Sequence, residues 1–299
     1  MEIKLFKTSQ GIITNLDFQN HIDKFDLKGK DVIVYSRLLS FGRLFGKEAV
    51  GSILTILKKA IGDKGTIIIP TYTLNTYKLP RIFNEAKSKV MSGILGELSV
   101  LDKDFERTVH PVYSNSVYGF NKQYYKTQSE TTCFGEGSFF DLFSKTKNGI
   151  ILMLGLNFNG PTLYHYYDQK FKAKGRFLKS FEVQIQTAEK EYLLNFDSYV
   201  KDHDFYNNKM NCLAMFDAVA NKMELVKTIY IGDGITHKIT ESNFKNLYKI
   251  ALEVDQGYFL ISNEEDWTEY YMRNNFKLFY DSISEKKFNE FKTKWNEYN

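Results

Sequence analysis

Two residues with the chemistry of a proton-transfer site, His165 and Asp168, lie three positions apart in the segment GPTLYHYYD. A spacing of three places both side chains on one face of a helix, where the carboxylate can orient the imidazole. The positive end of the helix dipole disfavours an imidazolium in the first turn, so we expect a neutral histidine, as a general base must be. Such pairs are common on solvated helix faces, and the pair alone favours that interpretation, so the case for a proton-transfer site depends on the rest of the chain.

A predicted strand and loop position this pair. Residues 150–156 form a short, branched apolar run that is typical of a buried strand, and residues 157–161 break the pattern with a Gly-Pro pair. Thr162 is predicted to be the N-cap of the helix that carries His165. Because ligands bind at the carboxyl ends of strands in open α/β sheets, we expect the functional site at this loop.

A strand–loop–helix–strand pattern lies earlier in the chain than the segment that carries His165. Residues 32–35 and 66–69 read as buried strands, and residues 48–61 between them have helical periodicity and end at Gly62. The pattern predicts parallel strands whose carboxyl ends lie at one edge of the sheet. The polar residues that follow the two strands are Ser36, Arg37, Thr71 and Thr73.

A polar loop around Pro111 is the next candidate for ligand binding. Its residues with hydrogen-bonding side chains are Arg107, Thr108, His110 and Ser114. A loop with this many donors fits a ligand clamp and an ordinary polar loop equally well.

The composition excludes several classes of function. A net charge of +4 without a Lys/Arg run argues against nucleic acid and permits an anionic ligand. The longest apolar run is too short to cross a bilayer, and the N-terminus lacks a signal-peptide core, so we expect no membrane contact. Cys133 and Cys212 lie far apart outside any CxxC pattern, which predicts a reducing cytoplasm and no metal site.

The remaining chain is predicted to complete one domain over residues 1–299. Residues 181–187 and 191–196 alternate as two strands of a hairpin, and residues 93–101 and 243–252 have helical spacing. A last helix is predicted after Ser284, with apolar residues on one face that dock on the core or contact a second copy. Residues 1–28 are predicted to be a lead-in with a short helix.

Six separated segments resemble the aminoglycoside 3-N-acetyltransferase family, also known as the antibiotic N-acetyltransferase family. They are GKDVIVYSRLLSFG at 29–42, GTIIIPTYT at 65–73, GILGEL at 93–98, RTVHPVYS at 107–114, FGEGS at 134–138 and GLNFNGPTLYHYYD at 155–168. They occur in the order and with the spacing of the family, so residues 29–180 carry the resemblance. Residues 181–299 are expected to complete the fold and the acceptor side.

The resemblance implies an α/β fold: a single domain with a central mixed sheet flanked by helices, distinct from the GNAT fold. It implies acetyl-CoA as donor, an amine as acceptor, no metal, and His165 as the general base. Asp168 stands where the family has Glu, and Asp197 is the alternative carboxylate. The residues expected at the coenzyme are Ser36, Arg37, Thr71, Thr73, Arg107, His110 and Ser114, with Arg43 as a further cation for the phosphates.

An acetyl transfer also needs donors for the developing oxyanion. The backbone N–H after Ser36 and the hydroxyls of Thr71 and Thr73 are the expected donors. The mild positive charge and Arg37, which replaces a Ser common in the family, favour a nucleotide-linked amino sugar of surface-polysaccharide synthesis as acceptor.

Three alternatives stay open from the sequence. The protein could acetylate an aminoglycoside, as the family name implies. It could be a non-catalytic carbohydrate-binding protein on the same scaffold, or a hydrolase with Cys133 as nucleophile. The sequence predicts no oligomeric state.

Overall fold

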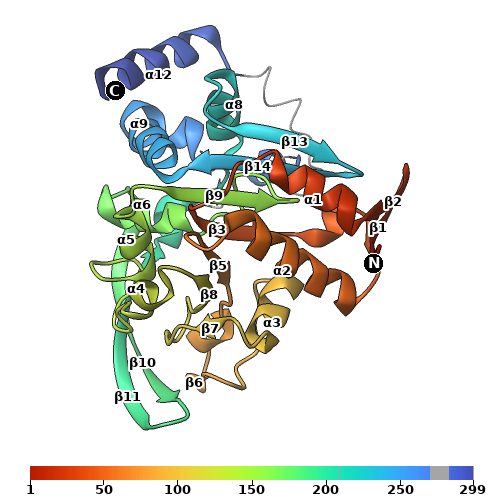
Figure 1. Cartoon of the computed structure of the whole chain (residues 1–299). Helices are drawn as coiled ribbons and strands as arrows, with labels where there is room; N and C mark the ends of the chain where they lie inside the picture. Colours follow the sequence, from red (N-terminus) through yellow and green to blue (C-terminus); the bar gives the residue numbers. More distant parts are fainter. Residues whose placement is uncertain (208, 270–282, 299) are drawn as a thin grey trace.

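The main sheet has seven strands and runs through the centre of the molecule (Figure 1). The computed structural model describes residues 1–207, 209–269 and 283–298. In spatial order the strands are β13 (Lys227–Ile231), β14 (Gly234–Thr240), β9 (Gly149–Leu154), β3 (Asp31–Ser36), β5 (Thr66–Pro70), β8 (Asn115–Gly119) and β7 (Glu106–Arg107).

The three central strands are parallel, and the outer ones are antiparallel to their neighbours. β3 pairs with β5 on one side and with β9 on the other, both in parallel. β14 and β8 then pair antiparallel with β9 and β5. The predicted strand–helix–strand unit and the predicted mixed sheet are therefore confirmed, and the carboxyl ends of β3, β5 and β9 lie at one edge.

Alternation along the central strands divides the core into two layers. On β3, Ile33 and Tyr35 join one apolar cluster, whereas Val32 and Val34 join the other. Apolar side chains point to both faces because helices cover both. This explains why these strands read as continuous apolar runs in the sequence.

Different parts of the chain supply the helices of the two layers (Figure 1). Residues of α1 (Asn15–Asp23), α2 (Lys47–Ile61) and α3 (Ile94–Leu101) pack in the cluster with Val32 and Val34. Residues of α5 (Phe139–Ser144), α6 (Leu163–Lys170), α8 (Ala214–Lys222) and α9 (Glu241–Phe259) pack in the cluster with Tyr35. The helices predicted at 48–61, 93–101 and 243–252 are thus present, the last of them longer than expected.

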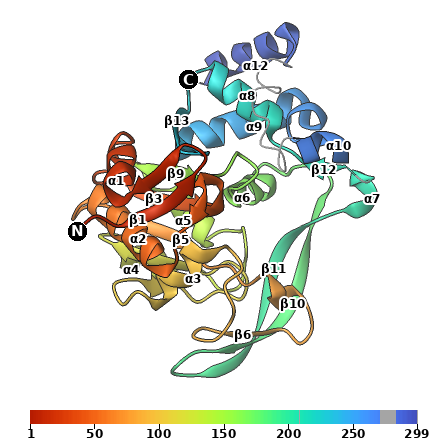
Figure 2. The ribbon, with the colours of Figure 1, turned by 90° about the vertical axis from the view of Figure 1, so that its right-hand side faces the viewer.

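A long hairpin extends from the body of the molecule (Figure 2). It is made of β10 (Arg176–Gln186) and β11 (Glu191–Lys201), which pair over their full length. The sequence predicted the hairpin but only its distal half, because the alternation of buried and exposed residues is clear only there. β6 (Ile82–Asn84) adds a short parallel strand to β10.

The N-terminal residues form the predicted short helix, α1, and a small sheet that the sequence did not predict. β1 (Lys4–Thr8) pairs with β2 (Gly11–Thr14) and β4 (Arg43–Leu44) in a small sheet, and Thr14 caps α1 in a capping box with Asp17. The strands are too short to give a periodic signal. Residues 1–28 are therefore part of the core layer rather than a lead-in.

The C-terminal helix docks on the core as predicted. α12 (Glu285–Tyr298) begins after Ser284, whose hydroxyl accepts from the amide of Lys287, and the buried Phe291 packs against Phe259 at 5.2 Å between ring centroids. Across the described ranges, no helix combines the length and apolarity needed to cross a membrane. The remaining short elements are η1 (Leu38–Phe41), η2 (Leu74–Tyr77), α4 (Lys122–Lys126), α7 (His203–Tyr206), β12 (Met210–Asn211), β15 (Ile261–Ser262) and α10 (Glu264–Trp267).

Candidate active site

Helix α6 carries His165 and follows β9 after the loop of residues 155–162. Thr162 occupies the predicted N-cap position, but it adopts a helical conformation and its side chain accepts no capping hydrogen bond. Its hydroxyl instead lies near the phenol of Tyr72. The first amides of α6 are therefore left without a side-chain cap.

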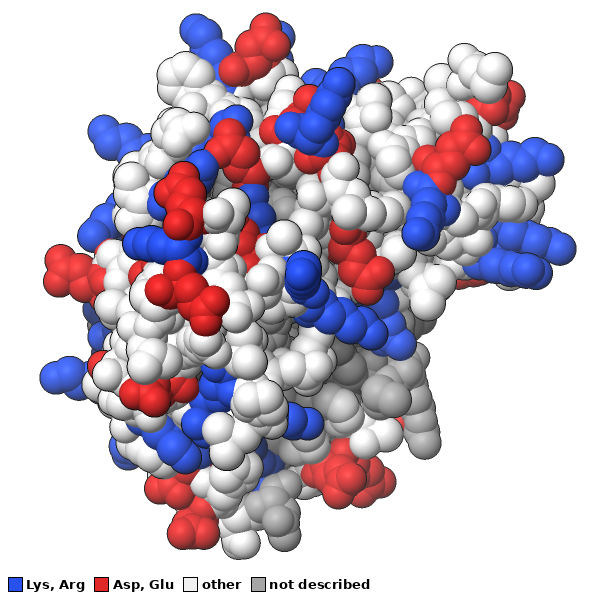
Figure 3. All heavy atoms as spheres, turned by 90° about the horizontal axis from the view of Figure 1, so that it is seen from below, with Lys and Arg blue, Asp and Glu red and all other residues white. Residues whose placement is uncertain are grey.

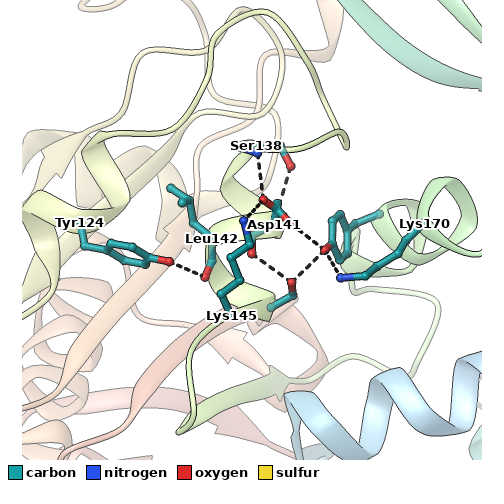
Figure 4. A network of polar contacts seen from close by, with 9 residues as sticks. Tyr124, Ser138, Asp141, Leu142, Lys145 and Lys170 are labelled. Atoms are coloured by element: carbon teal, nitrogen blue, oxygen red, sulfur yellow. Dashed lines mark hydrogen bonds and ion pairs between the residues drawn. The ribbon is translucent and has the colours of Figure 1, made fainter.

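A network around Asp141 fixes α6 against α5 (Figure 4). Asp141 accepts hydrogen bonds from the Tyr166 hydroxyl at 2.9 Å and from Lys145 at 2.7 Å, and Lys170 donates to the same tyrosine oxygen at 2.6 Å. Ser138 caps α5 by accepting from the amide of Asp141. Tyr166, which follows His165 in the helix, is thus held by charge-assisted hydrogen bonds, and these restrict the rotation of α6.

The carboxylate of Asp168 is the centre of the site. It is 3% exposed and has three partners from three elements. Nδ1 of His165 lies 3.3 Å from Oδ2, Nε of Arg176 lies 2.9 Å from the same oxygen, and the Tyr248 hydroxyl donates to Oδ1 at 2.7 Å. The contact of Nδ1 with a carboxylate favours the tautomer that leaves Nε2 as an unprotonated acceptor.

The electrostatics keep His165 neutral. Burial, and to a lesser extent the nearby cationic Arg176, lower the pKa of His165 to about 4 against the opposing effect of Asp168. The neutral imidazole is therefore the form present at pH 6 to 8. A base with this protonation state can accept a proton across the physiological range.

His165 lines a cavity of about 330 Å³ that is rich in aromatic residues and is bordered by the long hairpin of β10 and β11. Its side chain is 23% exposed, so the ring is reachable from solvent. The other residues lining this cavity, which we call the acceptor cavity, are Tyr77, Tyr113, Phe134, Arg176, Phe181, Ser198, Tyr199, Val200 and Lys201. The cavity combines ring faces with two cationic side chains.

A second cavity of about 380 Å³ lies at the carboxyl ends of β3 and β5, which we call the strand-end cavity. Ser36 and Arg37 line it from β3, Tyr72 from the segment after β5, and Thr162 from the turn before α6. Arg37 is exposed at its rim. Of the residues that the sequence placed at a ligand here, Ser36 and Arg37 therefore line the cavity.

The other predicted ligand residues are buried and bonded to protein atoms. The Thr71 hydroxyl contacts Ser114 Oγ at 3.1 Å, and Thr73 donates to the Pro111 carbonyl at 2.7 Å. His110 Nδ1 accepts from two amides, those of Val112 and Tyr113. These side chains hold the loop of residues 107–114 against the end of β5, which corrects their prediction as ligand contacts.

Arg107 also bonds within the protein. Its guanidinium donates to the carbonyls of Glu85 at 2.8 Å and Thr71 at 2.9 Å and to Ser114 Oγ at 3.1 Å. Burial lowers its pKa to about 10, which still leaves it cationic at neutral pH. Arg43 lies in β4 and lines a different cavity with Lys7, so neither arginine lines the strand-end cavity.

Asp197 points away from His165. Ser198, its neighbour on β11, lines the acceptor cavity, and successive side chains of a strand point to opposite faces. The Asp197 carboxylate accepts from Ser180 on the paired strand. The geometry therefore favours Asp168 as the carboxylate that supports His165.

Cys133 lacks the environment of a nucleophile. The thiol is 1% exposed, and burial raises its pKa to about 12, so the thiolate is not populated at neutral pH. Within the described ranges, no three His, Cys, Asp or Glu residues come together as a metal cluster.

Four residues of the site were not singled out from the sequence. Tyr35 and Tyr72 follow the two strand ends, and their place on the inward face could have been deduced from alternation with Ile33 and Ile68. Arg176 and Tyr248 could not, because only the tertiary fold brings them to Asp168.

The chain is similar to proteins of one family. A family model described as aminoglycoside 3-N-acetyltransferase matches residues 33–251. The solved structure of AAC-IIIb in binary complex with CoASH is 17% identical, with a TM-score of 0.64 over 80% of this chain and 96% of that chain. The YokD protein from Bacillus subtilis is 16% identical, with a TM-score of 0.63 over 79% of this chain and 96% of that chain.

A further solved structure contains an antibiotic. AAC-VIa bound to sisomicin is 16% identical, with a TM-score of 0.62 over 79% of this chain and 97% of that chain. At such identities the similarity of the structures shows a common fold. No curated protein sequence matches the chain.

The hydrogen bonds of Arg107 predict a role in stability. Arg107→Gln removes the guanidinium that donates to Glu85, Ser88, Thr71 and Ser114, and we expect it to lower the free energy of unfolding by about 2–4 kcal/mol. Arg37→Gln, at an exposed position, is the matched control and should change it by less than about 0.5 kcal/mol. Urea denaturation measures both, and equal effects of the two variants would contradict the structural role.

Proposed function

Because the chain belongs to the aminoglycoside 3-N-acetyltransferase family, we propose that it transfers an acetyl group from acetyl-CoA to an amine of an amino sugar. Membership makes it an acyl-CoA-dependent N-acetyltransferase with acetyl-CoA as co-substrate. The observation that carries the proposal is the neutral His165, held by Asp168 in a helix that borders both cavities.

The strand-end cavity is the proposed coenzyme site. It lies at the carboxyl ends of parallel strands, where α/β sheets bind ligands. Arg37 at its rim supplies a cation for a phosphate group of the coenzyme. The similarity to AAC-IIIb, which was solved with CoASH, supports this assignment.

The proposed reaction needs a base and a short path between the two substrates. The amine nitrogen attacks the thioester carbon and gives its proton to Nε2 of His165. Asp168 holds the ring through Nδ1, so the lone pair of Nε2 faces the acceptor cavity. Thr162 lines one cavity and His165 the other, and their spacing of three residues places them on one helix face.

The acceptor cavity supports an acceptor with a negatively charged group, such as a nucleotide-linked amino sugar. Arg176 and Lys201 line it. Because Arg176 is already paired with Asp168, Lys201 is the cation that the lining offers to an acceptor. Tyr199 and Phe181 offer ring faces to a sugar or base. In the face of the molecule shown in Figure 3, acidic side chains are interspersed with basic ones, without the acidic patch that would attract a polycation.

Aminoglycosides are the second candidate acceptors. The relative AAC-VIa was solved with sisomicin, and the family model carries the aminoglycoside activity in its description. An aminoglycoside would place several ammonium groups beside Lys201, which is unfavourable unless solvent separates them.

His165 is predicted to be required for turnover. Replacing it with Ala should lower kcat at least ~10²-fold, because the base acts in the transition state. The dissociation constant of CoA should change less than about 2-fold, since the imidazole is not needed to hold the donor. Thiol release and calorimetry measure the two quantities.

His203→Ala is the matched control for this variant. His203 is exposed on α7 and does not line either cavity, so kcat should stay at the wild-type value. Near-native turnover of the His165 variant at pH 7 would contradict the assignment of the base.

The cationic lining predicts the class of acceptor. We expect kcat/KM to be at least ~10-fold higher for UDP-glucosamine than for sisomicin, which corresponds to about 1.4 kcal/mol. Lys201→Glu should reduce this preference. Lys59→Glu makes the same charge change at an exposed position of α2 and should leave the preference unchanged. Acetylation of sisomicin without acetylation of UDP-glucosamine would contradict this prediction and identify the protein as an aminoglycoside-modifying enzyme.

A further inference from the structure

Two phenol groups at the strand-end cavity are buried without a hydrogen-bond partner. Tyr35 is 4% exposed and Tyr72 is 6% exposed, and neither hydroxyl has a partner at hydrogen-bonding geometry. Leaving such a group unsatisfied costs about 1–3 kcal/mol. Two of them on one wall of a cavity call for a functional explanation.

The two hydroxyls point to the same place. They lie near each other, and the Tyr72 hydroxyl also lies near the hydroxyl of Thr162. The backbone amides of Thr162 and Leu163 lie near the Tyr35 hydroxyl. These amides belong to the first turn of α6, where N–H groups have no acceptor within the helix and the helix dipole is positive. The result is a cluster of donors at the cavity wall.

The phenols keep their protons. Burial raises the pKa of Tyr35 and of Tyr72 well above the ordinary value, so both are neutral donors at any physiological pH. Their site is also shielded from water. In such a setting a hydrogen bond to a developing negative charge is stronger than in solvent.

The backbone amides at the ends of β3 and β5, including the one expected to bind the oxyanion, donate to other atoms of the protein. The amide of Arg37 donates to the Leu154 carbonyl at 2.8 Å, and the amide of Thr73 donates to the Val112 carbonyl at 2.8 Å. The amide of Tyr72 donates to Ser92 Oγ at 3.2 Å. The Thr71 and Thr73 hydroxyls are also bonded to protein atoms. The predicted oxyanion donors are therefore not available, and the two tyrosines remain.

We infer that Tyr35 and Tyr72, with the first amides of α6, form the oxyanion site of the acetyl transfer. This inference rests on the function proposed above. As the amine nitrogen bonds to the thioester carbon, the carbonyl π electrons move to oxygen, and the two hydroxyls donate to that oxygen. When the carbonyl re-forms, the C–S bond breaks, and the thiolate of CoA takes the proton that His165 accepted from the amine.

The arrangement places the acid–base group and the oxyanion donors about one helix turn apart on the same face of α6. His165 lies one turn after Thr162, and Tyr72 reaches towards the acceptor cavity through a ring contact with Tyr113 at 5.0 Å. A carbonyl carbon between the two cavities would have the base on one side and the donors on the other. This is the geometry that acyl transfer requires.

The test compares Tyr35→Phe, Tyr72→Phe and the double variant. Each single change should lower kcat about 10²-fold, both for transfer to an amine and for slow hydrolysis of acetyl-CoA without an acceptor. The dissociation constant of CoA should change less than about 2-fold, because CoA carries no thioester oxygen. Thermal stability should be unchanged or higher, because each change removes an unsatisfied buried hydroxyl.

Tyr118→Phe is the matched control, because this half-buried tyrosine of β8 packs against Phe105, away from the strand-end cavity. It should keep wild-type kcat. Wild-type kcat in the double variant would overturn this inference and leave the proposed function intact. Weaker CoA binding at unchanged kcat would have the same consequence. If the wild-type protein binds CoA but neither transfers nor hydrolyses the acetyl group, the proposed function fails and this inference with it.

Discussion

The buried carboxylate of Asp168 is the constraint on which the site depends. An ionised carboxylate is costly to bury unless it is paired, and here Arg176 and Tyr248 supply the pairing. Each partner comes from a different element, so β10 and α9 must both be in place before the carboxylate is satisfied. The remaining contact, to His165, then fixes the imidazole within a scaffold that is already stabilised.

The same interaction connects the two halves of the chain. The parallel strands and α6 come from the first 170 residues, whereas the hairpin and α9 come from the rest. Arg176 begins the hairpin that forms the acceptor cavity, so one guanidinium both neutralises Asp168 and lines the space for the acceptor.

The sequence predicts the frame of the site better than its lining. Apolar runs bounded by turn residues identified β3, β5 and β9, and parallel pairing then placed their carboxyl ends together. His165 and Asp168 could be paired because helical spacing is local. Tyr248 could not be assigned, since a contact across 80 residues leaves no periodic signal. Thr71, Ser114 and Arg107 were assigned to a ligand because side-chain type does not distinguish a buried hydrogen-bond network from a binding loop.

The central claim is that Asp168 fixes His165 as a neutral ring with the proton on Nδ1. The most direct test is the nitrogen-15 NMR spectrum of the imidazole, assigned with His165→Ala and recorded from pH 8 to pH 5. We expect the Nδ1–H tautomer at pH 7 and a ring that stays mostly neutral down to pH 5, in line with a pKa lowered to about 4. A ring that titrates near pH 6.5, or that carries its proton on Nε2 at pH 7, would contradict the account.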